Sequence, residues 1–280
     1  MSSLLQKLLA GLSSQPEVPT IALITDFGTR DSYVGALKAV IAGISPAARV
    51  IDITHDIDAH DVRQGAYSLW SSYRFFPRGT IFVAIVDPGV GSSREILIVQ
   101  ADEFTFLAPD NGMLDLVVSE HASVRTYSLR TSDEGGRWRR FALNEVSRTF
   151  HGRDVFAPLA AHLSLGVRPE QIGEPRTTLV RSVGFCDLAS GIGKPAILHI
   201  DTFGNLITNI RINAHSTRIA GLSIGRKAVG TWTASYEEAP PGEPCLIAGS
   251  SGLLEIVLRA GSAAKRLKAT KDSPLRLKMK

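Results

Sequence analysis

The sequence predicts an α/β protein, with an N-terminal α/β/α sandwich built on a mostly parallel sheet and a smaller, antiparallel β domain after it. Between residues 21 and 165, apolar strands alternate with amphipathic helices, as in parallel strands joined by crossover helices. Beyond residue 195, short strands alternate with turns. A chain of 280 residues is long enough for two modest domains. We expect an extension at 1–19, an α/β domain at 20–188 and a β domain at 195–280.

The first part of the α/β domain shows the alternation most clearly. Strands are predicted at 21–25, 50–55 and 81–86, because each is an apolar, β-branched run that ends at polar residues or a turn. The first helix should be capped by Asp31 or Ser32 and stop before Pro46, and the second should be capped by Asp61 and stop before Pro77. These elements form a strand–helix–strand–helix–strand order, which predicts a parallel arrangement.

The remaining elements are shorter. Strands are expected at 96–100 and 105–108, a turn at 109–112, an exposed loop at 131–140 and a helix at 155–165 that is closed by Gly166. The strands predicted for the second domain are 196–200, 222–224, 228–232, 245–248, 254–258 and 275–279.

Composition and charge narrow the class of protein. Hydrophobic residues make up 44% and charged residues 21%, and no apolar run approaches the roughly 20 residues that cross a bilayer. The excess of positive charge, +4 overall, gathers in a basic C-terminal tail without interleaved aromatic residues, so we expect neither a nucleic-acid nor a membrane partner. Residues 1–19 do not resemble a signal peptide, and Cys186 and Cys245 form no disulfide or zinc motif, so we expect a cytoplasmic protein.

Several polar residues follow the predicted strands. Asp26, His55 and Asp87 lie at strand ends that a parallel sheet brings to one edge, where α/β proteins bind ligands. Arg94 follows a Pro-Gly turn and can fold back towards Asp87; taken alone, this pattern is more typical of a turn with a surface ion pair. His151 precedes a helix, whose dipole should lower the imidazole pKa. These residues predict a cleft but name no substrate.

Other polar stretches leave alternatives open. The segment 55–61 is rich in His and Asp and could ligate a metal by residue type, although its spacing fits a solvated loop with a helix cap better. The glycines at 89–91 lack the lysine of a phosphate-binding P-loop. The segments 201–205 and 249–252 each follow a strand and turn on glycine, so either is an ordinary hairpin when considered alone.

Taken together, these motifs are similar to those of a known family. In order, they are residues 25–28, 52–55, 76–80, 86–91 with Arg94, 109–112, 150–154, Asp201 with 203–205, and 261–264. The set resembles the S-adenosyl-L-methionine (SAM) hydroxide adenosyltransferase family, relatives of the fluorinase and chlorinase. The resemblance implies a β-barrel-like C-terminal domain and a homotrimer whose active site lies between neighbouring subunits. It also implies hydrolysis of SAM to adenosine and L-methionine, without a cofactor or a metal.

The resemblance assigns roles to individual residues. It implies that Asp87, Arg94 and His151 are catalytic and that Asp26 binds the ribose, and it leaves open whether Asp87 or His151 accepts the proton. The other substrate-binding positions that it implies are Asp201 and Ser250 for methionine, and Phe203, Asn205 and Tyr236 for adenine or ribose. The fluorinase has Tyr in place of Asp87 and lacks His151, which favours hydrolysis over halogenation. It has Trp where this chain has His60, so the resemblance does not support His60 as a site residue.

Two further functions are compatible with the sequence. One is a non-catalytic protein that binds adenosine or SAM. The other is a metal-dependent hydrolase that uses His55, Asp56, His60 and Asp61 as ligands.

Overall fold

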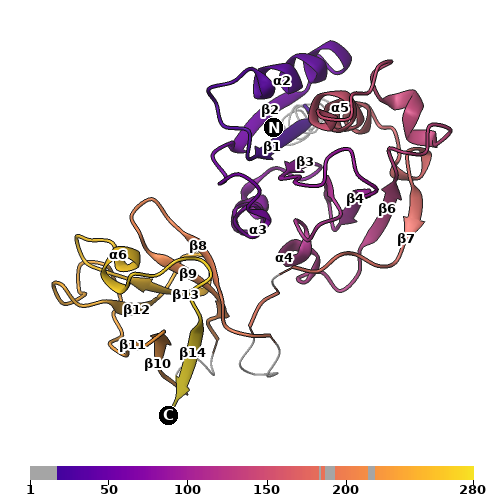
Figure 1. The fold of residues 1–280 in the computed structure, drawn as a ribbon. Helices are drawn as coiled ribbons and strands as arrows, with labels where there is room; N and C mark the ends of the chain where they lie inside the picture. The colour runs from indigo at the N-terminus through magenta and orange to yellow at the C-terminus, as the bar shows by residue number, and fades with distance from the viewer. Residues whose placement is uncertain (1–17, 183, 187–192, 214–217) are drawn as a thin grey trace, which may run out of the picture.

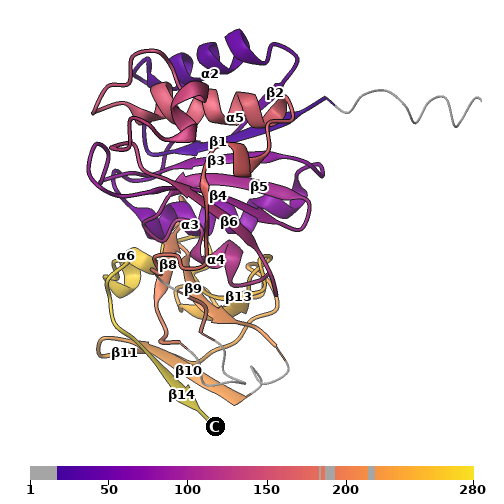
Figure 2. The ribbon, with the colours of Figure 1, turned by 90° about the vertical axis from the view of Figure 1, so that its right-hand side faces the viewer.

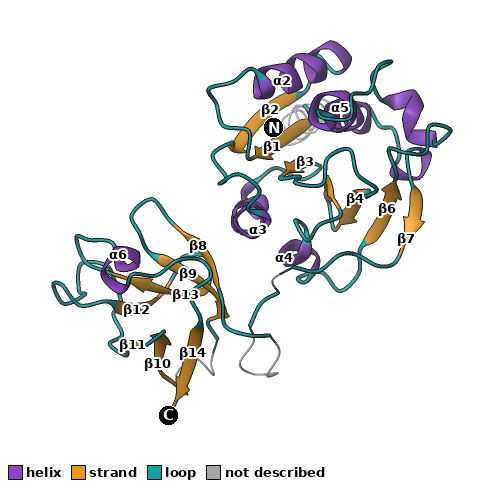
Figure 3. Cartoon of the chain, in the orientation of Figure 1, coloured by secondary structure: helices purple, strands orange, loops and turns teal. Residues whose placement is uncertain are grey.

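The computed structural model describes residues 18–182, 184–186, 193–213 and 218–280. These residues form a large sheet flanked by helices and a smaller part that consists mostly of strands (Figure 1; Figure 3). The predicted extension at 1–19, except for its last two residues, and most of the junction at 188–194 lie outside the described residues. Among the described residues, no helix combines the length and apolar character needed to cross a membrane.

The larger sheet has seven strands within the described residues, in the order β2-β1-β3-β5-β4-β6-β7. The first four in this order run parallel, and the remaining strands pair antiparallel with their neighbours. The strands are β1 (Thr20–Thr25), β2 (Arg49–Thr54), β3 (Ile81–Ile85), β4 (Ile96–Ala101), β5 (Phe104–Pro109), β6 (Arg125–Leu129) and β7 (Glu174–Arg176). The prediction of parallel strands is thus confirmed for the part of the sheet in which Asp26 and Asp87 follow adjacent strands.

Helices cover both faces of this sheet (Figure 2). The α-helices of this part are α2 (Tyr33–Ile44), α3 (Val62–Ser72), α4 (Asp115–Val118) and α5 (Ala157–Ser164), and the other helical turns are η1 (Tyr73–Phe75), η2 (Arg137–Phe141), η3 (Gly152–Phe156) and η4 (Pro169–Gln171). Side chains alternate along each strand, so Ile21 and Leu23 pack in one core with α2 and α5, whereas Ala22 and Ile24 pack in another with α3 and α4. The two cores confirm the predicted α/β/α sandwich.

The C-terminal part consists of two antiparallel sheets around a third core. In the described residues the sheets have the strand orders β12-β13-β9-β8 and β11-β10-β14. Their elements are β8 (Ile197–Ile200), β9 (Leu206–Arg211), β10 (Ile219–Ile224), β11 (Lys227–Val229), β12 (Cys245–Ala248), β13 (Leu253–Val257), α6 (Ala263–Leu267) and β14 (Leu275–Met279). The basic tail forms β14 at a sheet edge, as the alternation of Leu and basic residues predicts.

Strand β9 is absent from the sequence-based prediction, although all but its last residue is buried. The reason is that Thr208 and Asn209 interrupt its apolar pattern. In the structure, Thr208 donates to the carbonyl oxygen of Leu254 at 2.7 Å, and the Asn209 amide donates to two further carbonyl oxygens at 2.9 Å each. These hydrogen bonds satisfy both polar side chains inside the β core.

Two other predictions differ from the structure. The segment 131–140 is not simply an exposed loop, because it leads into η2 and buries Trp138, whose indole nitrogen donates to the Asp133 carbonyl at 3.0 Å. The helix predicted at 155–165 begins earlier, with the π-helical turn η3, and then continues as α5. Gly166 does follow its end, with a positive φ of 89°.

Side chains of helix α3 pack against the C-terminal part of the molecule. The ring of Tyr67 stacks on that of His199 from β8 with centroids 5.4 Å apart, and Trp70 meets Phe185 edge to face at 4.9 Å. Apolar side chains of β8, β9 and β13 belong to the same buried cluster as α3 and α4. The C-terminal part therefore packs against the α3 and α4 face of the large sheet (Figure 2).

Candidate active site

Asp87, Arg94 and His151 form one hydrogen-bonded cluster just beyond the end of β3. The Arg94 Nε donates to both carboxylate oxygens of Asp87, at 3.0 and 2.8 Å, and its Nη2 also donates to Asp87 Oδ2. The same Nη2 lies 3.1 Å from His151 Nδ1. The Arg94 and Asp87 side chains are only 9% and 6% exposed. The ion pair is therefore largely removed from water and is not the surface pair that an Asp-Pro-Gly turn usually makes.

A tight loop contact brings these distant residues together. Gly91 has a φ of +75°, and a Cβ at this position would lie 2.3 Å from the carbonyl oxygen of Arg148. The loop after β3 can therefore pack directly against the segment that leads to His151 only if residue 91 is glycine. The buried carboxylate of Asp154 holds the same segment, accepting from the backbone of Ser147 at 2.8 Å.

His151 is kept neutral by its surroundings. Burial lowers the pKa of its imidazole, and the nearby Arg94 guanidinium lowers it further, against the opposing effect of Asp87 and Asp154. The lowered pKa agrees with the expected direction, and burial is its largest cause. Because a guanidinium only donates hydrogen bonds, Nδ1 must be the accepting nitrogen, and a neutral ring then carries its proton on Nε2.

Asp26 lies beside this cluster in a pocket of about 290 Å³. The pocket is lined by Asp26, Asp87 and His151 together with the aromatic rings of Phe27, Tyr33 and Phe150. These rings contact one another with centroids 5.1–5.9 Å apart. Carboxylates and an imidazole therefore lie next to an apolar wall, an arrangement suited to an organic ligand with a few polar groups.

His55 does not join this pocket, contrary to the expectation that three strand ends would share one cleft. Its ring is buried, with Nδ1 2.8 Å from the Thr25 hydroxyl and Nε2 3.1 Å from Asp52. The Thr25 hydroxyl in turn accepts from the Phe27 backbone at 3.2 Å. His55 therefore supports the turn that presents Asp26 and does not face the ligand pocket.

His60 lines the pocket, although the sequence offers it only as a metal ligand and the family resemblance does not support it as a substrate-binding residue. Its backbone N–H donates to Asp26 Oδ2 at 2.9 Å, while its side chain is 71% exposed. His60 has a φ of +67°, a conformation that costs a non-glycine residue on the order of 1 kcal/mol. Backbone strain of this kind leaves no signal in the sequence.

The partners of the His- and Asp-rich segment explain it without a metal. Asp58 and Asp61 pair with Lys271, His55 contacts Thr25 and Asp52, and Asp61 also caps α3 by accepting from the Gln64 backbone at 2.9 Å. The predicted cap is thus confirmed. Across the described ranges, no three His, Cys, Asp or Glu side chains converge as a metal site requires.

A second pocket, of about 650 Å³, lies in the C-terminal part. Its lining includes four of the expected substrate-binding residues, Asp201, Phe203, Asn205 and Tyr236. Both carboxylate oxygens of Asp201 accept hydrogen bonds from Asn205, one from its backbone at 2.8 Å and one from its side chain at 2.9 Å. The turn between them requires Gly204, which has a φ of +86° and lies against Ser262.

Two neighbouring residues differ from the expected set. Ser250 is exposed on the turn between β12 and β13 and is not among the residues that line this pocket. Glu255 of β13 was not expected at all, yet it is buried and accepts from the Tyr236 hydroxyl at 3.4 Å. Burial raises the pKa of its carboxyl, and Asp201 raises it further. In the sequence Glu255 has the pattern of an ordinary strand residue.

The two pockets have no lining residue in common. Each exposes large apolar side chains at its rim: Tyr33 and Val90 are 47% and 37% exposed beside Asp26, and Phe203 and Tyr236 are 77% and 52% exposed beside Asp201. Exposed apolar residues gathered around polar pockets are typical of surfaces that a ligand or another chain covers.

Comparison with known proteins identifies the family. The sequence profile of the SAM hydroxide adenosyltransferase N-terminal domain matches residues 21–173, and that of the C-terminal domain matches residues 195–276. An (R)-S-adenosyl-L-methionine hydrolase from Thermus thermophilus is 34% identical over 92% of this chain and 98% of its own length. A fluorinase from Actinoplanes sp. is 28% identical over 74% of this chain and 75% of its own length.

The fold is shared with solved structures as well. The crystal structure of an uncharacterized conserved protein from Thermotoga maritima superposes with a TM-score of 0.78 at 30% identity, covering 92% of this chain and 99% of that one. The two family profiles match the two parts of the chain in order, and one relative aligns with the chain over nearly its whole length. The chain therefore belongs to the SAM hydroxide adenosyltransferase family.

Proposed function

We propose that this protein hydrolyses SAM to adenosine and L-methionine. The observation that carries the proposal is the cluster of Asp87, Arg94 and His151, of which Asp87 and His151 line the same pocket as Asp26. The relative from Thermus thermophilus is named for the R form of this substrate, and we extend the proposal to that form. Halogenation is not favoured, because a charged carboxylate repels a halide where it attracts the hydrogens of a water molecule.

The reaction requires a positioned nucleophile more than an activated leaving group. The oxygen of water forms a bond to C5′ of the ribose as the C5′–sulfur bond breaks, and the electron pair of that bond neutralises the sulfonium. Methionine leaves without needing a proton, and one proton from the water is released. Holding water in line behind C5′ and accepting its proton therefore supply the catalysis.

The cluster divides these tasks among its members. His151 accepts from Arg94 through Nδ1, so its other nitrogen carries a proton and can only donate to water. Asp87 keeps lone pairs beyond those shared with Arg94, so we propose Asp87 as the group that accepts the proton. Arg94 Nη1 is buried and has no hydrogen-bond partner among the described residues, which leaves its two N–H groups for a bound water.

We further propose that the active site is composite. Asp26 would bind the ribose hydroxyls in the α/β domain (20–188), while the pocket of Asp201, Phe203, Asn205 and Tyr236 in the β domain (195–280) of a neighbouring subunit would hold the adenine and methionine ends, with Ser250 near the carboxylate. Two observations support this: the pockets of one chain share no residue, and both have exposed apolar rims. We propose a homotrimer as the assembly, because the resemblance to the family implies one.

No cofactor enters the proposed reaction, because the sulfonium of the substrate supplies the leaving group and the protein supplies the base. We propose a cytoplasmic location, where SAM is made and consumed.

The reaction is tested by incubating the purified protein with the R and S forms of SAM and measuring adenosine and methionine by chromatography. We expect the two products in equal amounts, formed faster from the R form. Binding of adenosine without turnover would favour a non-catalytic binding protein. Full activity after treatment with a chelator is expected, and loss of activity that added metal restores would instead support metal-dependent hydrolysis.

The pH dependence of the reaction follows from His151. Since the imidazole must be neutral to accept from Arg94, and since its pKa is lowered from 6.5, we expect the decline of kcat/KM towards acid pH to be centred below pH 6.5. A pH–rate profile between pH 4.5 and 9 checks this. A decline centred at or above pH 6.5 would contradict it.

The same group affects stability. As the pH falls below 6.5, His151 takes up a proton more readily in the unfolded chain than in the folded chain, because folding lowers its pKa. The free energy of unfolding should therefore fall as the pH falls. His162 and His199, whose pKa values burial also lowers, act in the same direction. Urea unfolding at pH 7.5 and 5.5 should therefore show a smaller loss of stability for His151→Gln than for the wild type.

A further inference from the structure

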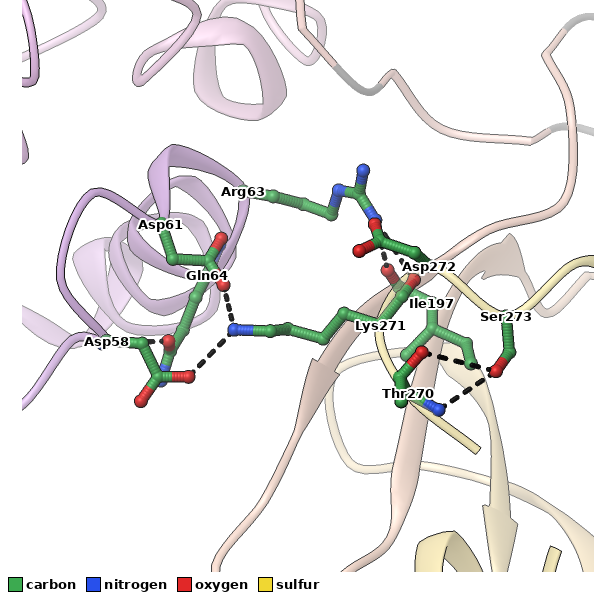
Figure 4. Close-up of polar contacts among 9 residues, drawn as sticks. All are labelled: Asp58, Asp61, Arg63, Gln64, Ile197, Thr270, Lys271, Asp272 and Ser273. Atoms are coloured by element: carbon green, nitrogen blue, oxygen red, sulfur yellow. Dashed lines mark hydrogen bonds and ion pairs between the residues drawn. The ribbon is translucent and has the colours of Figure 1, made fainter. Parts of the chain in front are cut away.

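We infer that Lys271, from the C-terminal part of the chain, is a positioning residue for the pocket of about 290 Å³ that Asp26 lines in the α/β domain. We call this pocket the ribose pocket. The inference rests on the proposed function, since it concerns the same pocket. It depends on the four-residue turn Asp58–Ala59–His60–Asp61, which we call the His60 turn, and on the ion pairs that Lys271 makes with its two ends (Figure 4).

The His60 turn forms part of the wall of the ribose pocket. Ala59 and His60 both line that pocket, and the His60 backbone donates to Asp26 Oδ2 at 2.9 Å. The same two residues also line a separate cavity of about 580 Å³, which Lys271 and Asp272 border from the other part of the chain. The turn thus separates the ribose pocket from the cavity at the junction of the two domains.

The backbone of this turn is strained. It closes with a hydrogen bond of 2.9 Å from the Asp61 N–H to the Asp58 carbonyl, and His60 occupies its third position with a positive φ of 67°. Glycine or asparagine normally fills this position in a type II turn. A histidine remains there only if surrounding contacts hold the turn closed.

Lys271 supplies such a contact. Its ammonium lies 2.7 Å from Asp58 Oδ2 and also pairs with Asp61 Oδ2, so one cation joins the first and last residues of the turn. Burial opposes the charge, but the two carboxylates raise the pKa of the ammonium above its ordinary value. Without Lys271, two like charges would face each other across a strained turn.

Lys271 is itself held in place from the α/β domain. Arg63, in the first turn of α3, donates to the carbonyl oxygen of Lys271 at 3.1 Å and to that of Ile197 at 3.3 Å (Figure 4). Its guanidinium also lies 3.6 Å from Asp272. Lys271 therefore reaches the His60 turn from a backbone that Arg63 holds in place. Through this contact the C-terminal part supports a wall of the ribose pocket, although none of its residues lines that pocket.

The test compares Lys271→Met with the wild type in adenosine binding by calorimetry and in SAM turnover. Loss of the ion pairs should let the turn open and displace the N–H that orients Asp26. We expect the Kd for adenosine and the KM for SAM to rise about fivefold. Lys271→Arg should restore both to within about twofold of the wild type, because it restores the charge. The melting temperature should change little, since apolar contacts of α3 hold the two parts together.

Two further variants keep the test decisive. Lys278→Met is the matched control, because Lys278 is an exposed lysine on β14 and, among the described residues, it is Lys271 and not Lys278 that pairs with Asp58 and Asp61; it should behave as the wild type. Asp58→Asn breaks the bridge from the other side and should raise the same Kd and KM, and adding Lys271→Met to it should cost less than in the wild-type background. If Lys271→Met fails to fold, Asp58→Asn alone decides.

The inference would be overturned if Lys271→Met left Kd and KM unchanged, or if Lys271→Arg did not reverse their rise. Turnover of SAM by the wild type would still support the proposed function in that case. If the wild type binds adenosine but forms none from SAM, the proposed reaction fails and the binding comparison still decides the role of Lys271. A wild type that neither binds nor reacts overturns both.

Discussion

Replacing Asp87 with Asn is expected to lower kcat for SAM hydrolysis about a thousandfold, the scale that a positioned general base contributes. The amide cannot accept a proton from water, and one of its two polar atoms would present N–H groups to the Arg94 guanidinium, which itself only donates. The affinity for adenosine should change less than about threefold, because adenosine is held by Asp26 and by the second pocket in our proposal. Steady-state kinetics and calorimetry measure the two effects separately.

The matched control for this variant is Asp56→Asn. Asp56 is exposed in the loop after β2, and the same chemical change there should leave kcat within about twofold of the wild type. The control also tests the metal alternative, in which Asp56 would be a ligand. Thermal melting of both variants is needed, because Asp87→Asn leaves the buried charge of Arg94 without its partner. A folded Asp87→Asn protein that keeps more than about a tenth of wild-type kcat would exclude Asp87 as the base.

Mixed assemblies of two inactive variants are expected to regain activity. Asp87→Asn damages only the pocket that Asp26 and Asp87 line, here called the first, and Asp201→Ala damages only the pocket that Asp201 lines, here called the second. Each variant should therefore be inactive alone. In a ring of subunits, a site is intact when the first pocket comes from an Asp201→Ala chain and the second from an adjacent Asp87→Asn chain. Each mixed trimer has one intact site among its three, so about a third of the wild-type activity should return. Co-expression with two affinity tags, followed by tandem purification and assay, measures this fraction.

A site contained within one chain makes the opposite prediction. Every chain in the mixture then carries one lesion in its own site, and mixed assemblies should be as inactive as their parents. The separate pockets and their exposed aromatic rims lead us to expect restoration. Sedimentation of the wild type should in addition show a trimer.

The sequence predicts the framework of the site well because local signals determine it. The apolar run of β3, ending at Asp87 and followed by proline and glycine, predicts a strand end whatever lies around it. The same holds for β1 before Asp26 and for the Asp61 cap of α3. The pairing of Arg94 with Asp87 is also local, since seven residues separate them.

Long-range packing determines what the sequence alone does not reveal. His151 meets Arg94 across 57 positions of the chain because Gly91 allows the loop against Arg148. His55 has the right position at a strand end but turns to Thr25 and Asp52. The role of His60 depends on a positive φ and on a lysine more than 200 residues away, and Glu255 is recognisable only once its burial is known. Resemblance to a family supplied the roles of the residues, but not these contacts.

The central claim is that water attacks C5′ of SAM, and running the reaction in water enriched in oxygen-18 tests it most directly. Mass spectrometry of the products should find one heavy oxygen in adenosine, at the 5′ hydroxyl, and none in methionine, with the signal reduced about a thousandfold in Asp87→Asn. Adenosine without the heavy isotope, or no adenosine at all from either form of SAM, would contradict the account.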